Sequence, residues 1–204
     1  MNTPSVPLFP LNLLPLPGET VALHIFEERY QALFHRLEAM ELDEFGIPFV
    51  DGDCLTSLGG LMRLVFASEP DENGFRDAAV QCFGLFKLAA QVHLPEPGDF
   101  PPYPSGDIAR WSDWKNFELT ENAETDFSKA EQLRKTPENE KFLCKPGNGL
   151  IQKLIRHQIA PKKRFEILNA PNVQRRNEQI NNAARFSFLI AEQEAQRNKG
   201  YFPN

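Results

Sequence analysis

The residue types that could act as nucleophiles are thinly spread along this chain. Three cysteines (Cys54, Cys82 and Cys144) and four histidines occur among 204 residues. A thiol becomes a useful nucleophile only when a base lies within hydrogen-bond reach, and sequence spacing alone does not establish such a pair. No serine sits in a G-x-S-x-G turn. We therefore predict no catalytic residue, and a Cys–His pair stays open as an alternative.

Metal and cofactor chemistry has equally little support. His24, Glu27, Glu28 and His35 supply metal-ligating side chains, but their spacing matches no known zinc motif. His24 lies in an apolar run, and the two glutamates open a helical pattern, where the helix dipole favours acids. We expect these four residues to be structural, and we expect neither a metal nor a cofactor.

A phosphate-binding loop is also missing. The glycine pair Gly147-Asn148-Gly149 is followed by Leu150 and Ile151, and not by the Lys-Ser/Thr that a P-loop requires. The chain therefore has no signature of nucleotide hydrolysis of this kind.

Charge gives a weak indication about partners. The 22 basic and 28 acidic residues leave a net charge of −6, which argues against a nucleic-acid partner. Basic residues nevertheless gather in the last third of the chain. Most such runs are solvated faces, and a docking surface for an acidic partner is the alternative. The residues of this basic set are Arg156, Lys162, Lys163, Arg164, Arg175 and Arg176.

The N-terminal stretch carries the clearest structural signals. The run from Val6 to Leu11 is apolar but interrupted by prolines, which cannot donate to a strand ladder, so it predicts an edge or entry strand. Pro17-Gly18 predicts a turn. Residues 20–26 predict a strand, and residues 27–40 predict a helix, because apolar side chains recur there at helical spacing.

Further strands are predicted up to residue 94. We expect them at 45–50, 58–67, 75–83 and 85–94, with a polar hairpin loop at 69–74 and a hinge at Gly84. Gly59-Gly60 predicts a bulge or a close backbone contact. About six strands with short links and one helix indicate a small, mostly antiparallel β-barrel.

The chain changes character at the proline-rich segment 95–106. We expect a β-barrel domain over residues 1–106 and a helical C-terminal portion over residues 107–204. Short helices are predicted at 128–136 and 138–143, then at 149 onward, at 161–168, and as a long final helix over about 173–198. The fold class is therefore α+β.

The stretch PLFPLNLLPLPGETVALHIFEERY closely resembles the start of the N-terminal, substrate-binding domain of Lon protease. The later segments around Gly59-Gly60 to Leu64 and Gly84 to Leu88 resemble strands of the same family, although the family usually has proline at the position of Glu28. The residues that carry the motif are Pro7, Leu8, Phe9, Pro10, Leu11, Pro17, Gly18, Glu19, Ile25, Phe26, Glu27, Arg29, Tyr30, Gly59 and Arg63.

The resemblance implies a PUA-like barrel followed by helices, and a role in selecting protein substrates. Lon owes unfolding and cleavage to separate ATPase and peptidase domains, for which 204 residues are too few. We therefore expect a stand-alone, non-catalytic module that binds unfolded or extended polypeptide. The alternatives are an enzymatic or RNA-binding role for a PUA-like barrel, and an adaptor to a separate protease or chaperone.

Localisation follows from what the sequence lacks. There is no apolar run near the length of a membrane span and no visible signal peptide, and three widely spaced cysteines fit a reducing compartment. We expect a cytoplasmic protein without a membrane partner.

Overall fold

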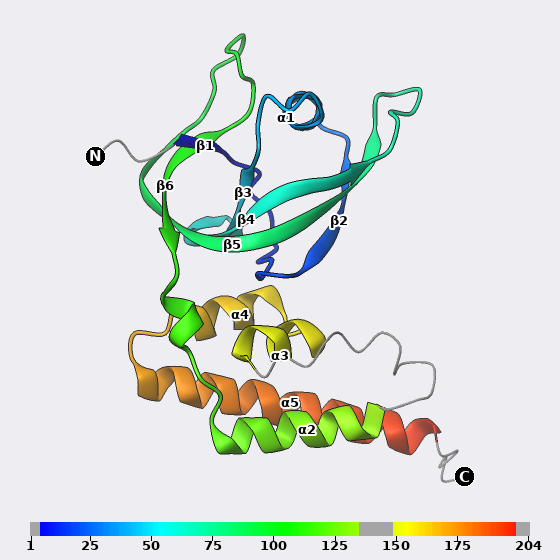
Figure 1. Ribbon diagram of the computed structural model, residues 1–204, viewed down its shortest axis with the longest axis vertical. Helices are drawn as coiled ribbons and strands as arrows, with labels where there is room; N and C mark the ends of the chain where they lie inside the picture. Colours follow the sequence, from blue (N-terminus) through cyan, green and yellow to red (C-terminus); the bar gives the residue numbers. More distant parts are fainter. Residues whose placement is uncertain (1–4, 135–148, 199–204) are drawn as a thin grey trace. The chain divides into compact units, whose positions relative to one another are not determined.

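The computed structural model describes residues 5–134 and 149–198. These residues form an antiparallel sheet and a group of helices (Figure 1). They form two compact units that divide after Trp114. We call residues 5–114 the sheet unit and residues 115–198 the helical unit. The proline-rich composition predicts a boundary after Gly106, whereas the structure divides further along the chain, after Trp114.

Six strands form the sheet: β1 (Ser5–Pro7), β2 (Thr20–Ile25), β3 (Phe45–Asp51), β4 (Cys54–Ala67), β5 (Arg76–His93) and β6 (Ser105–Trp111). Their order is β1-β6-β5-β4-β3, and β2 pairs with β5 beside this path. Every ladder between these strands is antiparallel. The predicted α+β class is confirmed, and the small, mostly antiparallel barrel that we expected is a curled antiparallel sheet.

The N-terminal segment joins the two ends of this strand order. β1 pairs with β6, and the residues after it reach β3 through parallel bridges at Leu8 and Leu11. The Leu8 amide donates to Pro104 O at 2.8 Å, and the Phe9 amide donates to Gly46 O at 2.8 Å. The proline-interrupted run is therefore an entry strand. One of its edges forms hydrogen bonds with β6, and the other forms hydrogen bonds with β3.

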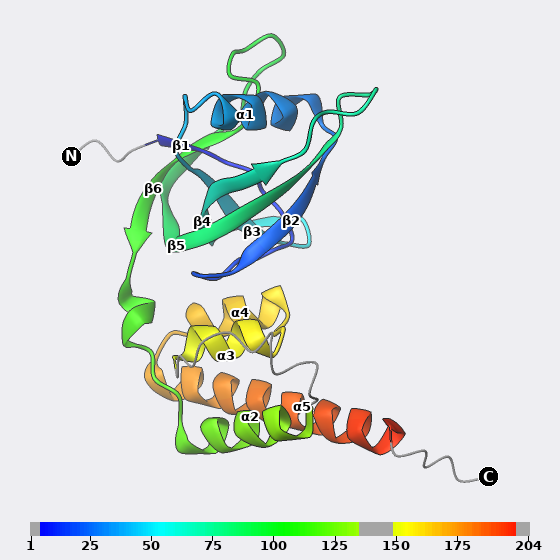
Figure 2. The same ribbon diagram turned by 45° about the vertical axis from the view of Figure 1, so that its right-hand side comes forward.

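Helix α1 (Glu28–Glu38) lies over one end of the curled sheet, as Figures 1 and 2 both show. Its buried side chains are Tyr30, Leu33, Phe34 and Leu37. The Phe9 ring stacks on Tyr30 at 3.9 Å between centroids, and the Phe34 ring meets Phe45 edge-on at 5.5 Å. The apolar stripe predicted for this helix is confirmed as its core-facing side.

A large ring inside the sheet depends on two glycines. Phe86 is fully buried among Val6, Leu8, Leu61 and Ile108. A Cβ at Gly59 would lie 2.5 Å from Phe86 Cζ and 2.6 Å from Ile47 O, and a Cβ at Gly46 would lie 3.0 Å from the same ring. The close backbone contact predicted at Gly59 is confirmed.

Three strand predictions need correction. The two strands expected at 75–83 and 85–94 form one continuous strand, β5 (Arg76–His93). The expected hinge at Gly84 is a register shift beside Phe83, because Leu61 pairs with Gly84 while Met62 pairs with Cys82. Strand β4 begins at Cys54, before the expected start at Leu58. Strand β6 was not predicted, because its apolar content is low and it begins at the end of the proline-rich segment.

The helical unit contains α2 (Glu121–Arg134), α3 (Leu150–Arg156), α4 (Pro161–Leu168) and α5 (Val173–Asn198), with a 3-10 turn at Asp113–Asn116 before them. The last three agree with the predicted helices. α2 begins earlier than the predicted residue 128. The helix predicted at 138–143 lies outside the described residues. Figures 1 and 2 show α2 alongside α5, where Phe127 and Ile180 are fully buried.

We predict that Gly59→Ala destabilises the sheet unit by about 2–3 kcal/mol, because the new methyl group overlaps a fully buried ring and a backbone oxygen. Urea unfolding followed by circular dichroism measures the loss. The matched control is Gly84→Ala, whose Cβ would meet nothing nearer than Leu61 Cδ1 at 3.8 Å. Equal stability of the two variants would show that the Phe86 site has room.

Candidate functional site

Most of the motif residues lie in the framework of the sheet unit. Leu8, Phe9, Ile25 and Tyr30 are buried. Gly18 has a φ of 93°, which favours glycine, in the turn before β2. In the same turn, Glu19 Oε2 accepts the Leu16 amide hydrogen at 2.9 Å. Pro7 lies in β1, Pro10 and Leu11 follow it, and Pro17 precedes Gly18.

One interpretation of the motif was wrong. The helix predicted over residues 27–40 implies that Glu27 and Arg29 pair with other groups, because residues two apart on a helix do not face each other. Glu27 instead has an extended backbone as the residue before α1, and Arg29 Nε donates to Glu27 Oε2 at 2.8 Å. Arg63, further along the motif, has its guanidinium 4.2 Å from the centre of the Phe83 ring.

Phe26 is the motif residue that stands apart, because its side chain is 56% exposed. Side chains alternate between the two faces of a strand, so Ala22 and His24 share the outer face of β2, and Phe26 directly follows the strand at the next alternate position. Across the ladder, Ala22 lies opposite Ala79 and Ala79 lies opposite Phe66, which is 61% exposed.

Three rings beside this part of β2 contact one another. His24 lies 6.2 Å from Phe26 and 6.1 Å from Phe75 between centroids, and Phe26 meets Phe75 at 6.5 Å. We call this surface the aromatic face, and its residues are Ala22, His24, Phe26, Phe66, Phe75 and Ala79. A cluster of exposed rings on one side of a sheet is suited to binding apolar side chains of a partner.

Two of the four residues considered for metal binding have other partners. His24 Nδ1 lies 2.9 Å from Asp77 Oδ1, and Glu27 is paired with Arg29. Over residues 5–134 and 149–198, no group of three or more His, Cys, Asp or Glu side chains is placed to hold a metal ion.

The cysteines are separated in the described structure. Cys54 is exposed at the start of β4, and Cys82 is buried in β5 with its Sγ 3.3 Å from Gly84 O. Cys144 lies outside the described residues.

The basic set is largely engaged within the helical unit. Arg164 is 7% exposed and donates from Nε to Ile159 O at 2.6 Å. Arg156 bonds Glu131, Lys163 bonds Glu166, and Arg175 bonds Glu178. The Arg176 guanidinium lies 3.5 Å from the centre of the Phe117 ring, and burial lowers its pKa. Lys162 follows Pro161 at the start of α4. Binding of an acidic partner by this set stays a prediction.

A Ser–His–Glu arrangement that the sequence did not reveal joins three helices of the helical unit. His157 Nδ1 lies 2.7 Å from Ser187 Oγ, and His157 Nε2 lies 3.4 Å from Glu131 Oε1. A neutral imidazole fits both contacts, with Nε2–H donating to the carboxylate and Nδ1 accepting the serine hydrogen. These are the residue types of a hydrolase triad, so their surroundings decide their role.

The surroundings of His157 are those of a structural network. The side chain sits against Phe127, and the exposed fractions of His157 and Ser187 are only 8% and 4%. Arg134 Nη1 from α2 lies 3.4 Å from His157 Nδ1. A nucleophile must face a space that admits substrate, and neither residue lines the pocket found in this unit. We therefore assign the network to helix packing.

Burial and hydrogen bonds together set the charges of His157 and Glu131, and burial dominates for His157. Burial lowers the pKa of His157 to about 4, against the opposing effect of the Glu131 carboxylate. Burial acts to raise the pKa of Glu131, but hydrogen bonds from Lys153 and Arg156 outweigh it, so this pKa lies below its usual value. At neutral pH the imidazole is uncharged and the carboxylate is ionised.

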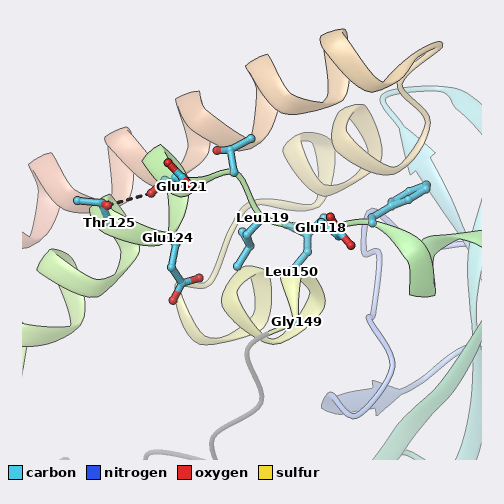
Figure 3. Close-up of a pocket in the computed structure, with 9 residues that line it drawn as sticks. Glu118, Leu119, Glu121, Glu124, Thr125, Gly149 and Leu150 are labelled. Atoms are coloured by element: carbon cyan, nitrogen blue, oxygen red, sulfur yellow. Dashed lines mark hydrogen bonds between the residues drawn. The ribbon is translucent and has the colours of Figure 1, made fainter.

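The pocket in the helical unit has a volume of about 680 Å³ and is lined by the 117–120 loop and the first turns of α2 and α3. Figure 3 shows Glu118, Glu121 and Glu124 among its lining residues. Glu124 pairs with Lys153 at 3.4 Å, and Thr120 Oγ1 bonds Asn181 beside the pocket. Carboxylates without a neighbouring nucleophile or metal set do not define a catalytic site.

Within the part of the chain that the structure describes, no helix is both long and apolar enough to cross a membrane.

Solved structures of other proteins have a similar fold. No family model and no curated protein matches the sequence. The chain is similar to the crystal structure of a Lon N-terminal domain protein from Xanthomonas campestris, with 20% identity and a TM-score of 0.60 over 87% of this chain and 96% of that one. It is also similar to the N-terminal domain of Lon protease from the Mycobacterium avium complex, with 15% identity and a TM-score of 0.62 over 89% and 98%. The resemblance seen in the sequence is confirmed as a shared fold.

We predict that the helical unit loses stability as the pH falls from 7 to 4.5. His157 takes up a proton near pH 6.5 when unfolded but only near pH 4 when folded, so acid favours the unfolded chain by about 2 kcal/mol. Urea unfolding of the intact chain and of His157→Gln at both pH values measures this effect. We expect a smaller pH dependence in the variant, while His35→Gln, which changes an exposed histidine, behaves like the intact chain. The same pH dependence in all three would contradict the assignment.

Proposed function

From the fold that this chain shares with Lon N-terminal domains, we propose that it is a non-catalytic module that binds unfolded or extended polypeptide. The fold alone does not carry a function, because one fold hosts many activities. The observation that supports this proposal is the aromatic face, which lies on the sheet unit. A partner could be the polypeptide itself, or a client presented to a separate protease or chaperone.

The aromatic face has the chemistry that such binding requires. Phe26 and Phe66 are more than half exposed, whereas the large rings of Phe34, Phe45, Phe49 and Phe86 are fully buried. A soluble protein gains from covering exposed rings, and each phenylalanine that is buried against a partner contributes about 1–2 kcal/mol. Unfolded chains expose the apolar side chains that can cover these rings.

The other groups considered do not form a reaction site in the described residues. Cys54 and Cys82 lie on different strands, His24 is bonded to Asp77, and Ser187 is buried with His157. Binding without chemistry therefore accounts for these side chains most simply.

We predict saturable binding between the purified protein and a fluorescently labelled, permanently unfolded polypeptide, measured by anisotropy at low and high salt. Binding should persist at high salt, because screening weakens charge contacts far more than apolar burial. The double variant Phe26→Ser/Phe66→Ser should bind about tenfold more weakly, since it removes two exposed rings.

Phe100→Ser is the matched control for this experiment, because Phe100 is 81% exposed but lies in the loop before β6, outside the aromatic face. It should bind as the intact protein does. If Phe100→Ser weakens polypeptide binding as much as the double variant does, any exposed ring can bind the polypeptide and the aromatic face has no special role. Loss of binding at high salt would favour the basic set, and absence of binding would overturn the proposed function.

A further inference from the structure

The outer edge of β2 is open. One side of this strand pairs with β5 from Thr20↔Gln81 to Ile25↔Arg76. On the other side, no strand and no isolated bridge meets β2 within residues 5–134 and 149–198. The Cys82 amide donates to Glu19 O at 2.9 Å. Hydrogen bonds in an antiparallel pair involve every second residue of a strand. The backbone amides of Val21, Leu23 and Ile25 therefore point toward β5, and the backbone amides of Thr20, Ala22 and His24 point away from it.

This edge lacks the usual protection. Proteins block open edges with prolines, lysines, bulges or inward-facing charges, since an open edge can pair with another chain. The sequence of β2, TVALHI, has none of these. By contrast, β1 contains Pro7, and β4 has a register shift between Leu64 and Phe66 in the part that pairs with β5 but not with β3.

The aromatic face begins at this edge. In an added strand, every second side chain would lie on the same face as Ala22, His24 and Phe26. Ala22 and Ala79 are small, so a large apolar side chain of the partner fits over them beside Phe66. The open backbone and the rings therefore offer one continuous binding surface.

Charge is uneven along β2. Its C-terminal end leads into Glu27 and Glu28, and the hairpin between β4 and β5, which contributes Phe75 beside His24, carries Glu69 and Glu72. Arg29 and Arg76 are already paired with Glu27 and Glu38. No ion-pair partner is found for Glu28, Glu69 or Glu72 in the described residues. This end of the edge is thus acidic and fits a basic partner.

We propose that an extended polypeptide segment binds by adding a strand to the outer edge of β2, with apolar side chains on the aromatic face and a lysine or arginine at the end near Glu28 and the hairpin. The proposal rests on the proposed function and assigns its binding mode. Backbone hydrogen bonds supply sequence-independent affinity, and the aromatic face and the acidic end select the segment.

The test uses labelled synthetic peptides of about ten residues, enough to span β2 at about 3.3 Å per residue. The parent peptide alternates valine and threonine and ends in two lysines. One derivative carries N-methyl groups on every second residue, and a second carries them on the intervening residues. In an added strand only one set of amides faces β2, so one derivative should bind about tenfold more weakly than the other.

Two further measurements test the edge and its charge. Ala22→Pro removes an outward amide and should weaken binding of the parent peptide about tenfold while leaving thermal unfolding near that of the intact protein. Phe100→Ser, which changes an exposed ring in the loop before β6, outside both the aromatic face and the edge, is the control and should bind within about threefold of the intact protein. Replacing the terminal lysines of the peptide by glutamates should weaken binding at low salt and have less effect at high salt.

The outcomes separate this binding mode from the proposed function. If both N-methylated derivatives bind as the parent does, strand addition is wrong, while polypeptide binding through the aromatic face stands. If neither the peptide nor the unfolded polypeptide binds, both are overturned. If sedimentation shows a dimer that Ala22→Pro dissociates, the edge pairs with a second copy of this chain, and the polypeptide mode is wrong.

Discussion

The sheet unit depends on the segment that ties its two ends together. Residues 5–11 pair with β6 on one side and with β3 on the other, and Val50 returns an amide hydrogen bond to Leu11 O at 2.9 Å. This closure brings Leu8 against Gly46 and Phe86, and it places Phe9 under Tyr30 of α1. The helix position, the core and the shape of the sheet all follow from this one set of bonds. Strand β2 lies outside this closed strand order and pairs with β5 on one side, so its other edge is free beside the rings of the aromatic face.

The two units solve the problem of buried polar groups differently. In the sheet unit, the backbone ladders satisfy the buried amides, and the deepest core side chains are apolar. In the helical unit, Glu131, Lys153, Arg156 and His157 form a partly buried network across α2 and α3, with Ser187 of α5 completing it. A buried network of this kind is costly if one member is lost, so it specifies how these helices pack.

Local patterns predicted much of this structure. The stop and start signals at Gly149, Pro161 and Pro171 place α3, α4 and α5, because capping and proline effects act within a few residues. Strand β6 was not predicted, because its apolar content is low and its pairing with β1 joins residues distant in sequence. The Glu27–Arg29 pair was misjudged because it depends on where the helix begins. The aromatic face required the register that aligns Ala22, Ala79 and Phe66, because the sequence of each strand alone does not show which strands lie side by side.

The closure by residues 5–11 also bears on how the chain acquires its structure. Ser5 pairs with Asp107, a residue that is synthesised about a hundred positions later. During synthesis from the N-terminus, the first strand must wait for its last partner, and pairings between such distant residues form slowly. Until then Leu8 and Phe9 lack their core neighbours. The sheet unit therefore completes its fold only after β6 has been synthesised.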